Sequence, residues 1–589
     1  MKKKAFIIIL LILFALCIAA CTANTSHNNE TMPATATAPK LDEAPIPEIE
    51  VVECTPYNEM IQLIFQPMED TVFEVLYKSE NEADYSKLSS DSMTINEAGN
   101  YECRIWGISS GNYEVLIRGM HSNDKIDSLE KKIEKLEVTG LDRSGYAHFE
   151  NEEGTGAYQD DGAVKENAQI IYVNNENKNT VTATFRNQTY TGLVDILQNA
   201  DCATEPLLIR ISGKITTNQY CYKEVIPRLV DNSNITEAHF ENIFSNEYGE
   251  NLVGLRVCHK DAKEGTAYNY VTTKDGIKFK KSYSIETSTT KYNCSKLPEL
   301  KGKEVYDDDT VFNCISISDA RNITIEGITP DAEIFQFGFS FNNCDSIEVK
   351  NLKFSQYPED AVAFMSSASN AVDTHKGFWV HHCDFYEGLN NWDLTGEQDK
   401  YQGDGSVDIN NVSDVTVSYC NFINTGKTCL VGSSDSAKCR NVTYHHNYYY
   451  GVQARLPFAR GTNIHMYNNY YDSCKEAVRV RCACYGFSEN NYFVNCGKAH
   501  LDNDDTSAIK SYNDVFQSTS EVQSVKVRDR EEYVENSCTI AGEDYSRFDT
   551  DSGLFYYDPV NKRSDVSIMN NPDDLKEFLE KYAGVKGVY

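Results

Sequence analysis

Two aspartates four residues apart open a strand-like run in the middle of the chain, at residues 404–408 (DGSVD). Because side chains alternate along a strand, Asp404 and Asp408 lie on one face. A third acid, Asp360, precedes an earlier apolar run. Stacked strands would bring the three carboxylates together, and such hard oxygen ligands suit calcium, with water completing a shell of about six to eight. Unrelated surface acids are the alternative, because this spacing is common by itself.

Two arginines five residues apart, Arg455 and Arg460, flank a proline later in the chain. The planar guanidinium group binds carboxylates through paired hydrogen bonds, so two of them on one edge favour an acidic ligand. Residues 351–410 hold ten acids and three bases, whereas residues 421–500 hold four acids and nine bases. These bands predict a cation site beside an anion-binding groove. Solvated arginines and a chance distribution of charge are the alternative.

The elements that position these residues are short apolar runs, each followed by Asn or Asp and then an aromatic or apolar residue. The markers that follow the runs are Gly327, Asn351, Asp384, Asn421, Asn447, Asn469 and Asn491. Their last two intervals are 22 residues, and two earlier intervals are 33 and 37. A base period near 22 predicts a solenoid of stacked β-coils, with loops that carry binding residues in the longer intervals. Asn suits the bends because it tolerates a left-handed backbone and can bond to the next coil.

Three neighbouring motifs carry a resemblance to a known family. They are TYHHNYY at residues 443–449, ARLP at 454–457 followed by Arg460, and HMYNNYY at 465–471. Together they strongly resemble the calcium-dependent extracellular pectate lyases, over about residues 141–500. The resemblance implies an all-β chain whose main domain is a right-handed parallel β-helix. It also implies cleavage of α-1,4-linked polygalacturonate, the acidic polymer of pectin, by β-elimination with Ca²⁺ as cofactor.

The resemblance also implies roles for single residues. The implied calcium ligands are Asp360, Asp404 and Asp408. Arg455 matches the catalytic base of the family, and Lys427 and Arg460 match residues that bind uronate carboxylates. His381 stands where the family has an aspartate. The adjacent histidines at 381–382 and 445–446 are interpreted as structural, because neighbouring strand residues point to opposite faces and would not share a metal.

β-Elimination gives a chemical reason for this set of residues. A base removes the weakly acidic C5 proton of a galacturonate, the glycosidic oxygen at C4 leaves, and no water is consumed. Cations on the neighbouring carboxylate stabilise the charge that develops. Arginine normally stays protonated, and surrounding cations would favour loss of its proton. This chemistry predicts activity that rises into alkaline pH.

Other functions stay open at this stage. A pectin lyase acting on methyl-esterified polymer would not need the calcium acids, and a pectin-binding surface lipoprotein without catalysis would need no base. A hydrolase would need paired aspartates as acid and base, and no pattern here supports one. The formal net charge of −33 disfavours nucleic acid as a partner. A monomer is expected.

The N-terminus predicts export. Residues 1–20 begin with three lysines and continue as an apolar run that is short for a membrane span. Small residues before Cys21 resemble a bacterial lipobox, which predicts a lipid on Cys21 and a lipoprotein anchored at the cell surface. An ordinary signal peptide or an uncleaved anchor is the alternative. Residues 21–47, rich in Ser, Thr, Asn, Ala and Pro, predict a flexible tether.

Two folded parts follow the tether. Residues 48–140 show short alternating strands and predict a small β-sandwich, similar to the fibronectin type III modules of carbohydrate-active enzymes, serving as a spacer or as a carbohydrate-binding unit. Residues 141–589 predict the β-helix with a C-terminal extension, in which 573–582 form a short amphipathic helix. Most of the 19 cysteines are expected to be buried thiols, with one or two disulfides.

Overall fold

The structure is a computed structural model, and it describes part of the chain. The described residues are 48–121, 129–149, 151–216, 314–335, 337–355, 357, 360–367, 375–386, 405–482, 484–502, 507–520, 569 and 571–588, with short strands at 252–258, 267–273, 276–283, 286–287, 290–291, 525–527, 539–540 and 543–544. The predicted signal, lipid site at Cys21 and tether therefore lie outside the described residues, and so does Asp404.

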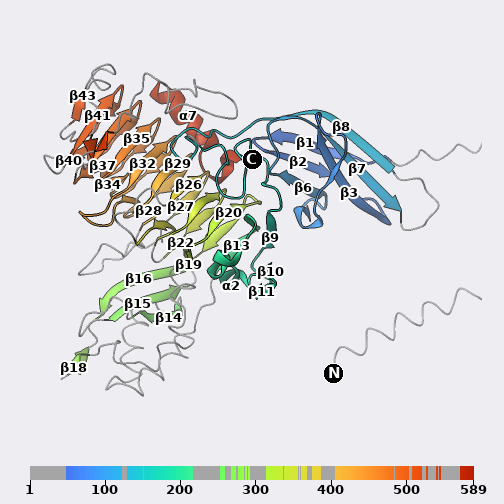
Figure 1. Cartoon of the computed structure of the whole chain (residues 1–589), viewed down its shortest axis with the longest axis horizontal. Coiled ribbons are helices and arrows are strands. Elements are labelled where there is room, and N and C mark those ends of the chain that lie inside the picture. The colour runs from blue at the N-terminus through green and yellow to red at the C-terminus, as the bar shows by residue number, and fades with distance from the viewer. Residues whose placement is uncertain are drawn as a thin grey trace, which may run out of the picture. The chain divides into compact units, whose positions relative to one another are not determined.

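Three parallel sheets form the main body within the described residues, and successive strands pass from one sheet to the next (Figure 1). Sheet I contains β9 (Gln169–Val173), β12 (Leu207–Ile211), β20 (Arg321–Gly327), β23 (Asp345–Lys350), β26 (Lys376–His381), β29 (Ser413–Ser418), β32 (Arg440–His445), β35 (Asn463–Tyr467), β38 (Tyr485–Glu489), β41 (Ala508–Tyr512) and β43 (Val525–Val527). Sheet II contains β13 (Lys214–Thr216), β21 (Glu333–Phe335), β24 (Lys353–Ser355), β27 (Asp384–Tyr386), β30 (Asn421–Ile423), β33 (Tyr448–Tyr450), β36 (Tyr470–Asp472), β39 (Tyr492–Val494) and β42 (Val515–Gln517). Sheet III contains β19 (Cys314–Ser318), β22 (Gly338–Asn342), β25 (Val362–Met365), β28 (Val407–Asn410), β31 (Cys429–Val431), β34 (Phe458–Arg460), β37 (Glu476–Arg481) and β40 (Lys498–Asp502).

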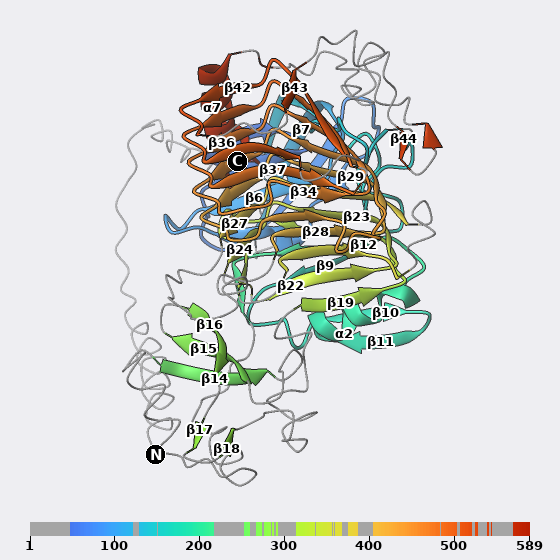
Figure 2. The same cartoon turned by 90° about the vertical axis from the view of Figure 1, so that its left-hand side faces the viewer.

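The predicted fold class is confirmed: the chain is mostly β, and its main body is a parallel β-helix. Figure 2 shows the strands of each coil stacked on those of the next. Inward residues of successive coils pair in register, as Ile323 does with Ile347 and Ile347 with Phe378. The stacked apolar rows form one continuous buried core inside the three sheets. Each coil therefore buries its apolar face only because its neighbours are present.

At each bend between sheets I and II, two neighbouring residues share two roles that the sequence interpretation gave to a single Asn. These roles are the left-handed backbone and the hydrogen bond to the next coil. The residue that adopts the left-handed backbone is His446, Asn468 or Asn490, with φ near 50°. The next residue forms an asparagine ladder: the Asn469 side-chain oxygen accepts hydrogen bonds from the backbone and side-chain N–H groups of Asn447. A hydrogen bond from Asn to the neighbouring coil was thus correctly expected. The Asn that forms it, however, follows the residue with the left-handed backbone by one position.

The ladder also corrects the coil register that the markers gave. The backbone N–H of Cys420, not of Asn421, donates to the side-chain oxygen of Asn447, so these coils are 27 residues apart. Asn421 instead pairs with Tyr448 in sheet II. A sequence count cannot separate these two alignments, because both positions follow a strand and both carry Asn in some coils.

The outer face of sheet I is covered by a segment at about residues 141–158 that precedes the first coil. Its backbone N–H groups at Ala147 and Ala157 donate to the buried hydroxyls of Thr416 and Thr324, at 3.0 and 2.8 Å. Glycine is required at position 145, where the backbone is left-handed and a Cβ would lie 2.6 Å from the Thr416 hydroxyl. A row of outward-facing residues on sheet I is thereby buried.

Two four-stranded antiparallel sheets precede this segment and pack around their own core. One sheet contains β1 (Val51–Tyr57), β2 (Met60–Phe65), β6 (Tyr101–Trp106) and β5 (Met93–Ile95). The other contains β4 (Ser86–Lys87), β3 (Thr71–Ser79), β7 (Gly111–His121) and β8 (Leu129–Val138). A buried ion pair joins Glu59 of this sandwich to Arg143 of the covering segment, with 3.0 Å between Oε2 and Nη2. The sandwich predicted before the β-helix is therefore present.

Smaller elements close and decorate the β-helix. Helix α2 (Leu193–Gln198) packs its leucines against the first coils of the core. Helix α7 (Pro572–Tyr582), capped by the side chain of Asn571, packs on Tyr470 and Tyr492 at the outer face of sheet II, which confirms the predicted C-terminal helix. The remaining elements are β10 (Thr182–Phe185), β11 (Gln188–Thr191), β14 (Leu252–Cys258), β15 (Ala267–Thr273), β16 (Gly276–Tyr283), β17 (Glu286–Thr287), β18 (Thr290–Lys291), β44 (Thr539–Ile540), β45 (Glu543–Asp544), and the 3-10 turns Ser90–Ser92, Ala200–Cys202 and Val585–Val588.

The state of the cysteines and the character of the helices can be given for the described residues. The described cysteines are thiols and most are buried, in agreement with the expectation of buried thiols. Among the described residues, none of the helices combines the length and the apolar character that crossing a membrane requires.

Candidate functional site

Asp360 and Asp408 meet at the outer edge of sheet III. Asp360 precedes β25, and Asp408 is the second residue of β28, where it pairs with Ala363 of β25. The backbone N–H of Gly405 donates to Asp360 Oδ1 at 2.8 Å. A Cβ placed on Gly405 would lie 2.9 Å from Asp360 Oδ1 and 2.2 Å from Asp408 Oδ1. The two carboxylates therefore converge on one glycine.

Parallel pairing brings these acids together from distant parts of the sequence. The N–H groups of Ala361 and Val362 donate to the carbonyls of Gly405 and Ser406, both at 3.0 Å, which aligns the two coils. The buried hydroxyls of Tyr357 and Ser406 are joined by a 2.8 Å hydrogen bond beneath the same turn. The backbone that carries the carboxylates is thus held on both sides.

This pair of carboxylates fits a hard cation. Carboxylate oxygens are the ligands that calcium prefers, and glycine at position 405 lets both carboxylates approach the same backbone, where any Cβ would clash with them. Burial raises the pKa of the Cys429 thiol on the adjacent strand, and the negative charge of Asp408 adds to that rise. Asp404 lies one residue before Gly405, outside the described residues. The assignment of all three acids to calcium stays a prediction.

Basic residues occupy the next two coils of the same sheet. Lys427 lies just ahead of β31 and forms an isolated parallel bridge with Ala454. Ala454 is the residue that precedes Arg455. Arg455 has a left-handed backbone with φ of 67°, a conformation that costs about 1–3 kcal/mol for residues other than glycine. The hydrogen bond from Cys429 N–H to the Arg455 carbonyl, at 2.8 Å, helps to hold it. Such strain persists only where surrounding contacts fix it, and it marks candidate functional positions.

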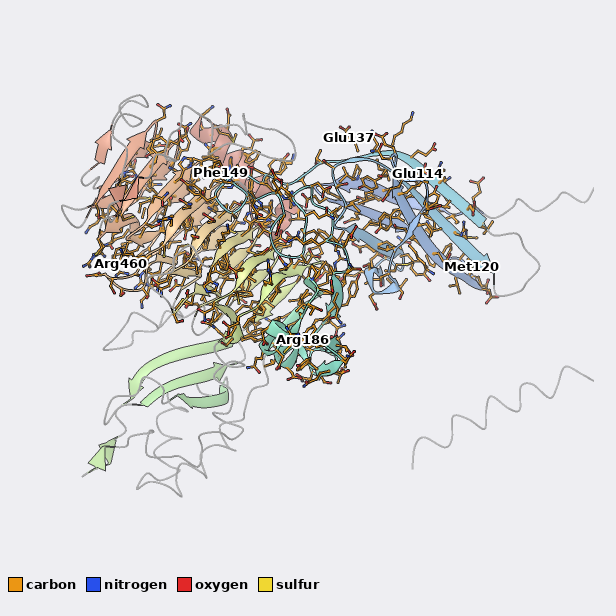
Figure 3. The ribbon with its side chains drawn as sticks, viewed as in Figure 1. Glu114, Met120, Glu137, Phe149, Arg186 and Arg460 are labelled. Carbon is orange, nitrogen blue, oxygen red and sulfur yellow. The ribbon has the colours of Figure 1, made fainter. Side chains whose placement is uncertain are left out.

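Arg460, Arg479 and Arg481 form a group of basic side chains, here called the platform: Arg460 and Arg479 lie at the ring of Phe458, and Arg481 pairs with Arg460 in sheet III. The guanidinium carbons of Arg460 and Arg479 lie 4.1 and 4.7 Å from the Phe458 ring centre. Nη1 of Arg460 donates to the carbonyl of Gly432 at 2.6 Å. Figure 3 labels Arg460 at the edge of the stacked coils.

The acids and the platform are near neighbours along the stack. Asp408 pairs with Leu430 on β31, and Leu430 pairs with Phe458 on β34. Two strand spacings therefore separate Asp408 from the platform, a distance of about 10 Å. Burial lowers the pKa of Arg460, and the charges of Arg481 and Arg455 lower it further, against the opposing charge of Asp435. Sheet III thus presents a pair of acids followed by a group of basic side chains.

The adjacent histidines lie elsewhere, on sheet I. His381 ends β26, stacks on Trp379 with ring centres 3.5 Å apart, and contacts Glu348 at 3.1 Å. The expectation that adjacent histidines point to opposite faces is wrong: the Nδ1 atoms of His381 and His382 lie 2.8 Å apart. The reason is the left-handed backbone of His382, with φ of 49°, which interrupts the alternation of the strand.

A second pair, His445 and His446, lies close to Asp142 in a buried cluster whose geometry would admit a metal. Hydrogen bonds account for both nitrogens of His445 and for Nδ1 of His446 without a metal, whereas no hydrogen bond reaches the buried Nε2 of His446. His445 Nε2 lies 3.2 Å from the carbonyl of Ser144, which makes Nε2 the donor and leaves Nδ1 to accept from His446 Nδ1 at 2.9 Å. Burial lowers the pKa values of His445 and His446 to about 4 and 3, so both rings are neutral. The interpretation of these histidines as structural residues therefore agrees with their contacts.

Sequence reasoning missed three residues of the platform region: Phe458, Arg479 and Arg481. A signal was available for Arg481, because it follows Arg460 by nearly one coil period and pairs with it in sheet III. It also missed Asp435, whose carboxylate contacts both Arg460 and Arg481. Nothing in the local sequence around Asp435 points to a contact with a strand that lies later in the chain.

Comparisons with known proteins point to one family. Residues 306–546 match a family model described as pectate lyase. Pectate lyase 1 of Pectobacterium atrosepticum is 35% identical over 179 residues, which are 30% of this chain and 46% of that protein. Pectate lyase A of Aspergillus niger is 31% identical over 219 residues, 36% of this chain and 64% of that protein. The matched region spans about half the length of the curated relatives.

Solved structures of pectate lyases also match. One is a pectate lyase from Bacillus sp. N165 in complex with trigalacturonate, with a TM-score of 0.40 and 18% identity over 75% of this chain and 98% of that one. Another, from Acidovorax avenae subsp. citrulli, has a TM-score of 0.42 and 15% identity over 76% of this chain and 95% of that one.

Proposed function

We propose that this chain, whose residues 306–546 match the pectate lyase family, is a pectate lyase that cleaves α-1,4-linked polygalacturonate. The observation that carries the proposal is the convergence of Asp360 and Asp408 on Gly405, two strands before a platform of arginines. A pair of acids for a divalent cation beside basic side chains for carboxylates is the arrangement that β-elimination on a polyanion requires.

The reaction removes the C5 proton of a galacturonate and breaks the C4–O bond. The electron pair of the C5–H bond forms the new double bond, and the pair of the C4–O bond leaves with the glycosidic oxygen, which takes up a proton. We assign the proton abstraction to Arg455. Arg455 directly follows Ala454, which pairs with Lys427 in the neighbouring coil, and the Arg455 carbonyl accepts a hydrogen bond from Cys429 N–H. A base must be unprotonated to accept the C5 proton, so activity should rise into alkaline pH.

Lys427 and Arg460 are proposed to hold the uronate carboxylates of the substrate. Arginine suits this task because its planar fork matches a carboxylate. Asp360 and Asp408, with Asp404 as the third predicted ligand, would hold Ca²⁺. When bound, calcium supplies positive charge to the substrate carboxylate and lowers the cost of the charge that develops at C5. The proposed reaction therefore needs both the acids, which would hold calcium, and the basic residues, which would hold the substrate.

The test is the ultraviolet absorbance of the 4,5-unsaturated product when the full chain acts on polygalacturonate, with calcium and with EDTA. We expect product with calcium and loss of product with EDTA. Unsaturated product that persists in EDTA, or appears only with methyl-esterified pectin, would indicate a pectin lyase. New reducing ends without unsaturation would indicate a hydrolase. Binding of the polymer without any cleavage would leave the non-catalytic surface lipoprotein as the function.

We also propose that the protein is a monomer held at the bacterial surface by a lipid on Cys21. The support is the run of small residues before Cys21 after an apolar segment, followed by a polar tether. Expression with a radiolabelled fatty acid tests it: the wild type should carry the label and partition into detergent. A Cys21→Ser variant should do neither. An unlabelled, fully soluble wild type would contradict the anchor.

A further inference from the structure

The arginine platform already holds one carboxylate, and that carboxylate belongs to the chain itself. Asp435 Oδ2 accepts a hydrogen bond from Arg481 Nη2 at 2.6 Å. Its other oxygen, Oδ1, lies 3.3 Å from Arg460 Nε. The Asp435 side chain is 59% exposed, whereas the side chains of Arg460 and Arg481 are 14% and 33% exposed. Asp435 therefore lies over the platform from the solvent side.

The loop that carries Asp435 is fixed at both ends. Ser433 donates its backbone N–H and its hydroxyl to Asn410 Oδ1, at 3.0 and 2.9 Å. The carbonyl of Gly432 accepts from Arg460 Nη1 at 2.6 Å. At the far end, the backbone N–H of Lys438 donates to Asn411 Oδ1 at 3.0 Å. Between these anchors the loop brings Asp435 to Arg460, which the proposed function assigns to substrate, and to Arg481.

We propose that Asp435 competes with the carboxylate of the substrate for the arginines: it binds Arg460 and Arg481 when no substrate is bound and leaves them when a uronate binds. The inference rests on the proposed function, because it concerns the same platform. It adds Asp435 as a residue that sets the affinity for acidic polymer. It also adds Arg481 as a second cation, beside Arg460, that binds the uronate carboxylate after Asp435 has left.

The contact is suited to exchange. Exposed ion pairs contribute only about 0–1 kcal/mol, because water and salt screen them. The Arg460 Nε atom is buried and within 3.3 Å of Asp435, yet it has no hydrogen bond there, so the pairing is poorly aligned. A uronate carboxylate free to orient could bond both nitrogens of the fork. Substrate would therefore replace a weak internal contact with a better one.

Competition of this kind lowers the apparent affinity in proportion to the fraction of molecules in which the site is open. Removing the competitor should raise affinity for substrate and leave the chemical step unchanged. A residue that merely positioned the arginines would do the opposite, because its loss would disorder the platform. The two roles are separated by the direction of the change in KM.

The experiment compares wild type with Asp435→Asn, using polygalacturonate and saturating calcium. We expect KM to fall by about threefold to tenfold with kcat unchanged within a factor of two. The Asp435→Glu variant keeps the competing charge and should retain the wild-type KM or exceed it. An unchanged or higher KM in Asp435→Asn, or a fall in kcat, overturns the proposal.

A matched control removes the same charge elsewhere on sheet III. Asp319 is exposed and follows β19, and its left-handed backbone, with φ of 55°, accepts asparagine. Asp319→Asn should leave KM unchanged, and an equal fall in KM would show that general repulsion of the polyanion, not displacement, is responsible. Failure of the proposed function is distinguishable, because the wild type itself would then give no unsaturated product.

Discussion

The outer faces of sheets I and III are both charged, but only one is open. Beneath the covering segment of sheet I, charged side chains are buried and meet a partner: Arg210 lies 2.8 Å from Glu326, and Lys350 lies 3.4 Å from Glu348. On sheet III the Asp435 and Arg481 side chains are paired yet remain 59% and 33% exposed. The comparison shows that charge alone does not identify a functional surface. Access to solvent separates the surface that can exchange partners from the one that cannot.

The covering segment accounts for the difference. Residues near 141–158 lie on sheet I and contribute Arg143 to its buried charges, where it pairs with Glu59. Burial alone would raise the pKa of Glu59, but the charge and hydrogen bonds of Arg143 hold that pKa below its usual value. A buried pair of this kind stabilises only while both partners remain. Sheet I is therefore interpreted as structural and sheet III as functional.

The sharpest test of the role given to sheet III is Arg455→Lys, which keeps the positive charge and replaces the proposed base. We expect kcat on polygalacturonate to fall by about 10³-fold, in the range that general base catalysis contributes. Arg321→Lys makes the same substitution at an exposed position of sheet I and should leave kcat unchanged. Stopped assays at several pH values measure both. Full activity in Arg455→Lys would remove the assignment of the base.

On the structural side, Arg143→Met should lower the free energy of unfolding by about 3–5 kcal/mol, because Glu59 would be left buried without its partner. Adding Glu59→Gln should recover part of that loss. Urea denaturation measures stability, and kcat of the folded variant should match the wild type. A loss below about 1 kcal/mol, or a specific loss of kcat, would contradict the division between the two faces.

The pair of acids can be disturbed through Gly405, which lies between them. In Gly405→Ala the new methyl group would lie 2.2 Å from Asp408 Oδ1, so a carboxylate must move. We expect the calcium concentration for half-maximal activity to rise by about 10-fold to 100-fold, the usual effect of disturbing the support of a metal site. Gly486→Ala is the control, since its Cβ would meet ordinary contacts at 3.4 Å and beyond. An equal rise of this calcium concentration in Gly405→Ala and Gly486→Ala would argue against a calcium site at Asp360 and Asp408.

The smallest predicted effect concerns Asp514, which ends the asparagine ladder inside the β-helix. Burial raises the pKa of its carboxyl to about 7, against about 4 in an unfolded chain. Between these values the folded protein holds an extra proton, so the free energy of unfolding falls as pH rises from about 4 to 7. Asp514→Asn should flatten this decline and stabilise the protein at pH 8 by about 1–2 kcal/mol. Unfolding curves at pH 5 and 8 measure it, and a variant less stable at pH 8 would contradict the shift.

Several features were predictable because they depend on local spacing. The 22-residue interval between Asn469 and Asn491 indicated stacked coils, and the structure pairs these residues at that interval. Asp360 and Asp408 were recognised as candidates by type and by family resemblance, and the parallel pairing of β25 and β28 brings them together. The marker at Asn421 failed by one residue, since two neighbouring positions follow each strand and the sequence does not say which one bonds to the next coil.

By itself, the sequence determined a repeating β-coil, an acidic segment followed by a basic one, and the residue types that elimination on a uronate needs. These depend on composition and period, which the chain carries locally. Only the tertiary structure decided that sheet I is covered, that both rings of a histidine pair turn to one side, and that Asp435 reaches Arg460 and Arg481. Those outcomes depend on left-handed backbone angles and on contacts between coils, and neither is encoded in the spacing of residues along one strand.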